Sequence, residues 1–270
     1  MRWLLTVAII WGLMAAAAAA QTYSPQRPLP RTTSMPTLRA LATQREVEER
    51  FKLGIDAEAR GDWTSAVAEF NRIVALNPPE PKGSTARYDL AIAYANLGRY
   101  DDAATELRAA LALDPAFLAA MANLVSVDIA RGDLAQARQV ADRYVAVDPD
   151  SARALYSRGI VALRSGDAAT AREDFGKLLR NNPSYAVAYY DLALAEERLG
   201  RYESAERQLR AALSLAPAYA RARFALGVVL LREGEHGAAR NEFQRASVDA
   251  AGDPALQNIA AAARDSIPAP

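Results

Sequence analysis

Residues 95–115 read ANLGRYDDAATELRAALALDP, and residues 196–217 repeat this pattern as EERLGRYESAERQLRAALSLAP. In both stretches a glycine is followed by an alanine at the fifth position after it and by a proline at the seventeenth. The glycine occurs six times; the last five copies are evenly spaced at thirty-four positions, and the first interval is three positions longer. A fixed period in this range indicates a solenoid, in which each unit buries its apolar face against its neighbours. The recurring residues are Gly61, Gly98, Gly132, Gly166, Gly200 and Gly234; Ala66, Ala103, Ala137, Ala171, Ala205 and Ala239; and Pro78, Pro115, Pro149, Pro183 and Pro217, with Ala251 at the sixth proline position.

Each unit reads as an antiparallel pair of helices. The glycine can take the left-handed conformation that ends a first helix, and the proline cannot continue a second one. Mostly small residues lie seven positions before the glycine, and mostly bulky ones lie nine positions after it. We therefore expect the helices to cross closely there, with large side chains beside small ones, as a packed core requires. The two sets are Gly54, Ala91, Val125, Gly159, Ala193 and Gly227, and Phe70, Leu107, Ala141, Phe175, Leu209 and Phe243.

Over residues 47–251 the sequence resembles the tetratricopeptide repeat family, because period, turn glycine, second-helix alanine and terminal proline recur together. The resemblance implies an all-α fold, a right-handed superhelical solenoid of about six hairpins whose first helices line a concave groove. We assign residues 44–253 to this solenoid. Two departures are local: PPEPKG at residues 78–83 lengthens one turn, and Arg158 stands where an apolar residue is expected.

The two ends of the chain carry their own patterns. Asp253 and Pro254 suit a helix start, so we expect residues 254–270 to form a capping helix and a frayed tail that begins at Ile267. Residues 1–20 have the basic, apolar and alanine-rich parts of a cleavable signal peptide, with cleavage before Gln21. Residues 21–43 are expected to be a proline-rich linker leading into the first helix, which begins near Thr37.

The signal-peptide pattern of residues 1–20 predicts an exported, periplasmic protein. The alternative is an uncleaved inner-membrane anchor, because the uncharged run over residues 3–20 has a length near the lower limit for crossing a bilayer.

Composition argues against several functions. The 32 basic residues equal the 32 acidic ones, which gives no footprint for a nucleic-acid binder. The absence of cysteine and the single histidine, His236, leave little material for a metal site or a catalytic triad. We therefore expect a protein that is not an enzyme, with no cofactor and no metal, and we expect His236 to pack at a hairpin turn.

Function is expected in the groove. Ten positions before the turn glycines, at a place that faces the groove in this family, five of the six side chains are aromatic. Six positions before the glycines, five of the six are aliphatic. Three arginines share the position two before the glycines, and Arg153 and Arg221 lie near the same rim. These candidate groove residues are Phe51, Tyr88, Tyr156, Tyr190 and Phe224; Ile55, Ile92, Ile160, Leu194 and Val228; and Arg164, Arg198 and Arg232.

An apolar floor with arginines at its rim suits an apolar or acidic amphipathic segment of a partner protein. The competing interpretation is that the rings pack between helices and the arginines are solvated surface. We therefore predict a protein-binding scaffold or adaptor of the bacterial cell envelope. The alternative function is an accessory protein that binds or exports polysaccharide, with the rings stacking on sugars.

Overall fold

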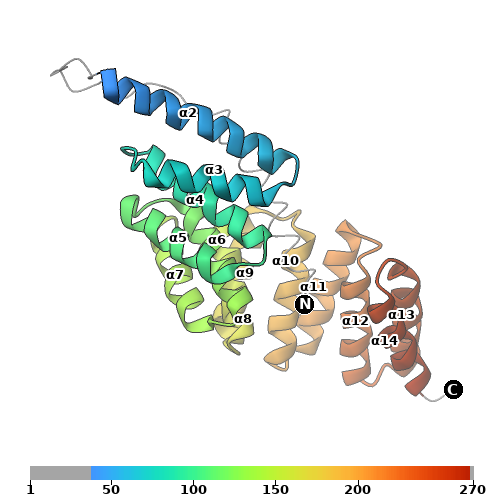
Figure 1. Cartoon of the computed structure of the whole chain (residues 1–270). Coiled ribbons are helices and arrows are strands. Elements are labelled where there is room, and N and C mark those ends of the chain that lie inside the picture. Colours follow the sequence, from blue (N-terminus) through green and yellow to red (C-terminus); the bar gives the residue numbers. More distant parts are fainter. Residues whose placement is uncertain (1–37, 268–270) are drawn as a thin grey trace. The chain divides into compact units, whose positions relative to one another are not determined.

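The computed structural model describes residues 38–267, and every regular element in that range is an α-helix (Figure 1). The predicted signal peptide and most of the predicted linker lie outside the described residues. Helix α2 begins at Leu38, so residues 38–43 of the segment assigned to the linker are helical. Within residues 38–267 no helix combines the length and apolar character needed to cross a membrane.

The chain divides after Tyr144 into two compact units. In the first, successive helices from α2 to α6 pack against one another in chain order, and the boundary falls within α7. These helices are α2 (Leu38–Ala59), α3 (Trp63–Ala75), α4 (Lys82–Asn96), α5 (Tyr100–Leu113), α6 (Leu118–Arg131) and α7 (Leu134–Val147).

The second unit continues the pattern, and its last helix packs on the one before it. Its helices are α8 (Ala152–Arg164), α9 (Ala168–Asn181), α10 (Ala186–Arg198), α11 (Tyr202–Leu215), α12 (Ala220–Arg232), α13 (His236–Asp249) and α14 (Pro254–Ser266). Helix α14 is the predicted capping helix, with Asp253 accepting a hydrogen bond from the Leu256 amide at its start (3.2 Å).

The hairpin turns form as the glycine pattern predicts. All six turn glycines have φ between 71° and 84°, a region that strains residues with a Cβ. The amide after the glycine donates back across the turn, as Asp62 does to the Ala57 carbonyl (2.9 Å). Asp62 and Asp167 also cap the following helices through their side chains. Turn geometry is therefore set locally by a short sequence signature.

The close crossings inside the hairpins are confirmed. A Cβ added to Gly159 would lie 2.6 Å from the Phe175 ring, and the equivalent distances are 2.5 Å at Gly54 and 2.7 Å at Gly227. Hairpins whose first helix carries alanine at this position, such as Ala193, carry leucine in place of phenylalanine. The pairs thus keep a nearly constant volume, as dense packing requires.

Three local expectations change with the structure in view. Arg158 occupies its apolar position because it reaches the carboxylate of Asp174, which is 1% exposed, through two hydrogen bonds of 2.8 and 2.6 Å. Ile267 is not part of a frayed tail: it is buried among the last helices, and its carbonyl accepts a hydrogen bond from Arg240. His236 does not pack at the turn but is exposed as the first residue of α13.

Candidate functional site

The predicted groove aromatics are held by other rings. Tyr156 lies 5.8 Å from Phe175 of its own hairpin and 5.5 Å from Tyr185, between ring centroids. Tyr190 lies 5.3 Å from Tyr219 in the same way. Phe51 and Phe224 pack on the phenylalanines of their own hairpins, and Tyr88 packs on Phe117. Ring packing therefore accounts for much of this column, as the competing interpretation held.

A hydrogen bond between successive first helices recurs in both units. In the first unit the Asn123 side-chain amide donates to the Tyr88 hydroxyl (2.8 Å). In the second unit the Tyr156 hydroxyl donates to the Asp191 carboxylate (2.9 Å). The tyrosine holds the aromatic position of one repeat, and its partner directly follows the aromatic position of the next repeat. Asn123 follows Ala122 in this way, and Asp191 follows Tyr190. We call this arrangement the inter-repeat bond; Asn123 and Asp191 are not among the residues predicted for the groove.

Asp191 is a buried carboxyl at this position. The residue is only 7% exposed. Burial raises the pKa of Asp191 to about 7, although the bond from Tyr156 and the positive charge of Arg164 lower it. Arg164 itself is exposed. The second unit therefore contains an acid that titrates near neutral pH.

The first unit has a carboxyl at the same register. Asp89 corresponds to Asp191, but the aromatic position of the preceding repeat holds Phe51, which has no hydroxyl to donate. Burial and the nearby charge of Glu58 raise the pKa of Asp89 well above its usual range. Burial also raises the pKa of Glu58 to about 7, and its Oε1 atom is buried with no hydrogen-bond partner. Because Phe51 has no hydroxyl, Asp89 does not receive the hydrogen bond that Asp191 receives from Tyr156.

A pocket opens in the second unit where the inter-repeat bond is missing. The residue opposite Tyr190 in this register is Ala225, which cannot accept from the Tyr190 hydroxyl. A cavity of about 370 Å³ lies here, between α10, α12 and the start of α14. We call it the α10–α12 pocket; its lining comprises Tyr190, Ala193, Leu194, Glu197, Leu209, Arg221, Phe224, Ala225, Val228, Val229 and Leu256. It brings together four of the predicted groove residues, namely Tyr190, Leu194, Phe224 and Val228.

Two charged side chains line this pocket without a bonding partner in the described part of the chain. Arg221 and Glu197 are half-buried, and neither makes a hydrogen bond or an ion pair with any residue in the range 38–267. By contrast, Arg223, two positions from Arg221, pairs with Glu242 (3.2 Å) and also donates to the carbonyl of Pro217. Burial raises the pKa of the Tyr190 hydroxyl, as do the charges of Asp191 and Glu197, while the charge of Arg221 lowers it, so all three charged groups are within electrostatic reach of this hydroxyl.

The remaining predicted residues lie outside this pocket. Arg198 and Arg232 are exposed, and Arg198 donates to the carbonyl of Leu163. Ile160 is half-buried in the second unit. In the first unit Ile92 is half-buried, whereas Ile55 is 52% exposed. The predicted arginine column therefore does not supply the arginine of the pocket; Arg221 does.

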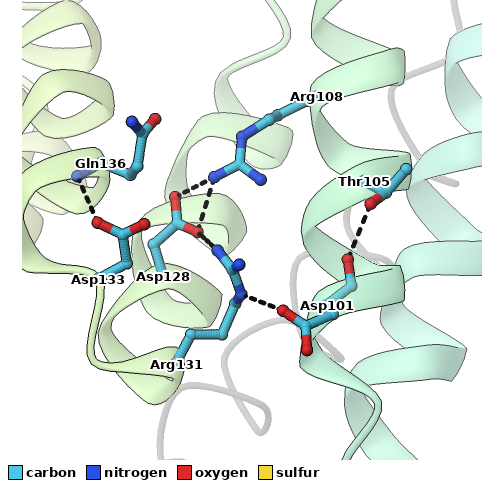
Figure 2. A network of polar contacts seen from close by, with 7 residues as sticks. All are labelled: Asp101, Thr105, Arg108, Asp128, Arg131, Asp133 and Gln136. Carbon is cyan, nitrogen blue, oxygen red and sulfur yellow. Dashed lines mark hydrogen bonds and ion pairs between the residues drawn. The ribbon is translucent and has the colours of Figure 1, made fainter.

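A second hollow, in the first unit, is explained by internal ion pairs. It measures about 560 Å³ and is lined by Gly98, Tyr100, Asp101, Arg131, Gly132 and Asp133. Figure 2 shows Arg131 reaching Asp101 (2.8 Å) on one side and the fully buried Asp128 (2.9 Å) on the other. Arg108 completes the pairing of Asp128 with two bonds of 2.9 Å. The two arginines thus pair with the two aspartates and join α5 to α6, so the charges of this network are committed within the protein.

Comparison with known proteins gives one family. Three family models, each described as Tetratricopeptide repeat, match residues 51–116 and 190–254, residues 98–158, and residues 153–185. No curated protein matches the chain significantly.

Solved structures share the fold at low sequence identity. A tetratricopeptide repeat protein from Parabacteroides merdae is 18% identical with a TM-score of 0.61, and the match covers 81% of this chain and 99% of that one. MamA is 22% identical with a TM-score of 0.56, covering 59% of this chain and 94% of that chain. The APC/C hetero-tetramer Cut9-Hcn1 gives 18% identity and a TM-score of 0.61, covering 85% of this chain and 48% of that chain.

Proposed function

Because this chain belongs to the tetratricopeptide repeat family, we propose that it is a non-catalytic scaffold that binds a segment of another protein through the first helices of its repeats. The proposed binding surface is the face formed by α10 and α12. The occupant is an amphipathic segment whose apolar side chains enter the α10–α12 pocket. Such docking of an amphipathic element into an apolar groove is a common mode of peptide recognition.

One observation carries the proposal: Tyr190 and Leu194 on α10 and Phe224 and Val228 on α12 line a single cavity of about 370 Å³. Concave, mostly apolar cavities with a few polar groups are the usual form of a binding site.

We further propose that the protein is exported and acts in the periplasm of a bacterial cell envelope. The support is the signal-peptide pattern of residues 1–20. Fractionation of the native host together with mass spectrometry of the mature amino terminus tests this. A periplasmic form beginning at Gln21 is the expected result, whereas a membrane-bound form retaining residues 1–20 would establish the anchor instead.

Polysaccharide binding is the less favoured alternative. Sugar stacking needs exposed ring faces with polar groups beside them, and Tyr156 and Tyr190 direct theirs toward other rings at 5.3–5.8 Å. Retention of purified protein on an envelope polysaccharide, lost on substitution of Tyr190, would support it over a protein partner.

The binding surface is tested by photo-crosslinking in the native host. A photoreactive amino acid replaces Leu194, which lines the pocket, or Leu215, which is 43% exposed on the second helix α11. The same partner protein should be captured from Leu194 and not from Leu215. Equal capture from both positions would show that binding does not use the proposed face.

A further inference from the structure

We propose that the α10–α12 pocket recognises an acidic side chain of the partner, which Arg221 and the Tyr190 hydroxyl bind together while the neighbouring apolar side chain of the partner fills the cavity. This inference rests on the proposed function and specifies the chemistry of the segment bound. It assigns a role to Arg221 that the predicted arginine column does not have.

The inter-repeat bond is missing at Tyr190, where Ala225 takes the place of the bonding partner. At the two equivalent places the tyrosine hydroxyl is satisfied, by Asn123 in the first unit and by Asp191 in the second. At the third place Ala225 supplies only a methyl group, and the Tyr190 hydroxyl has no hydrogen-bond partner within the described chain. This hydroxyl is not among the buried side-chain atoms without a partner, so it faces solvent in the pocket, where a ligand acceptor gains a bond that the protein does not make itself.

The Arg221 guanidinium makes no ion pair within the described residues. Arg221 lies on the same pocket and has no carboxylate or carbonyl partner in residues 38–267, although the neighbouring Arg223 is paired. A guanidinium presents several donors in a planar fork that matches a carboxylate. Two donors without acceptors on one cavity wall therefore define a site for an anionic acceptor.

The other charges near the pocket act in both directions on an anionic ligand. Arg221 stands in the first turn of α12, where the amino-terminal end of a helix favours negative charge. Arg232 is the last residue of α12, at the opposite end of that helix from Arg221. Glu197 lines the pocket and Asp191 lies within electrostatic reach of the Tyr190 hydroxyl, so both negative charges oppose an acidic ligand.

The rest of the lining selects the neighbour of the acid. Leu194, Val228 and Leu256 make an apolar floor large enough for one bulky side chain. On a helical partner, residues three or four apart share a face. The inferred ligand is therefore an amphipathic helix that carries a bulky apolar residue and, one turn away, Asp or Glu.

The test uses a series of fluorescently labelled amphipathic peptides with amidated carboxyl termini. Members are identical except for Glu, Gln or Lys one turn from a central phenylalanine, and affinity is read by fluorescence anisotropy with the mature protein. Wild type should bind the Glu peptide about 10-fold more tightly than the Gln peptide, the size of one charge-assisted hydrogen-bonded pair at a half-buried site. The Lys peptide should bind most weakly.

Four variants assign the preference to named groups. Arg221→Gln should bind Glu and Gln peptides equally, whereas Arg232→Gln, the same change on the exposed part of α12, should keep the preference. Glu197→Gln should strengthen binding of the Glu peptide. Ala225→Asn should give Tyr190 the partner that Tyr88 has, and should abolish binding while leaving the unfolding temperature unchanged or higher.

Several results would overturn the inference: no peptide of the series binds, the Glu preference is absent in wild type, or it survives Arg221→Gln. A free carboxyl terminus that outcompetes the internal Glu would show that the pocket prefers a chain end instead. None of these results affects the crosslinking at Leu194, which tests the proposed function separately.

Discussion

Replacing Gly159 with alanine tests the close helix crossing that the repeat pattern predicts. The new Cβ would lie 2.6, 2.8 and 3.0 Å from three atoms of the Phe175 ring, which is fully buried and has no free volume to enter. Overpacking of this kind costs about 3 kcal/mol at the upper end of its usual range, and the better helix propensity of alanine offsets about 1 kcal/mol. We expect a net loss of about 2 kcal/mol in the stability of the α8–α9 hairpin.

Urea unfolding, with amide hydrogen exchange to localise the change to α8 and α9, measures this loss. Gly176→Ala is the matched control, because this α9 glycine has only the flexible end of Arg180 near its added Cβ, at 3.9 Å; it should stabilise by about 0.5–1 kcal/mol. Adding Phe175→Leu to Gly159→Ala recreates the alanine–leucine pair of other hairpins and should recover at least about 1 kcal/mol. A Gly159→Ala protein as stable as wild type would refute the constant-volume crossing.

Three further predictions test other parts of the account. Burial raises the pKa of Asp191 from 3.8 to about 7, so between these pH values the folded state holds a proton that the unfolded chain has lost. The stability should therefore fall as the pH rises from about 4 to about 7, by at most about 4 kcal/mol. Asp191→Asn should flatten this part of the urea-midpoint profile, and an unchanged slope would contradict the prediction. Phe51→Tyr should supply the missing hydroxyl to Asp89, lower the pKa of that carboxyl as followed by NMR titration, and raise the unfolding temperature; a pKa that does not move would show that the two residues are not in register. Ala205→Leu should cost about 1–3 kcal/mol in urea unfolding, because Ala205 is fully buried where α11 meets α10, and an unaffected midpoint would mean that the assigned register is wrong.

The fold could be predicted from sequence because its determinants are local and repeated. A turn glycine such as Gly166 fixes the backbone of a turn, and a proline such as Pro183 ends a helix, whatever the distant parts of the chain do. The Gly159–Phe175 pair is a contact within one hairpin, between residues that are close in sequence. Six copies of the same pattern reinforce one another, so one irregular member such as Ala141 leaves the pattern intact.

The site could be predicted only in part. The register placed Tyr190, Leu194, Phe224 and Val228 on the first helices, and the structure brings these four to one pocket. Packing of the rings between helices is one of the two interpretations of the sequence. The register did not show that some of their partners are tyrosines in the turns between repeats, such as Tyr219.

The polar members could be predicted only in part: Arg221 is expected near the rim of the groove, whereas Asp191 is not singled out. Asp191 follows the aromatic position and aligns with Asn123, a correspondence visible in the sequence, but its burial depends on how the next repeat packs. The arginines that share one position, Arg164 among them, are exposed, whereas Arg221 reaches the pocket from the first turn of α12. Which arginine lacks a partner is a property of side-chain pairing in three dimensions, and spacing along the chain does not encode it.

The most direct test of the proposed scaffold function is the affinity of the crosslinked partner for three purified proteins: wild type, Leu194→Arg and Leu215→Arg. The two substitutions are chemically identical, but the first puts a charge into the α10–α12 pocket and the second puts it on the exposed part of α11. We predict at least about 100-fold weaker binding for Leu194→Arg, the effect of losing a binding hot spot, with Leu215→Arg equal to wild type. Wild-type affinity in a correctly folded Leu194→Arg protein would contradict binding through this pocket.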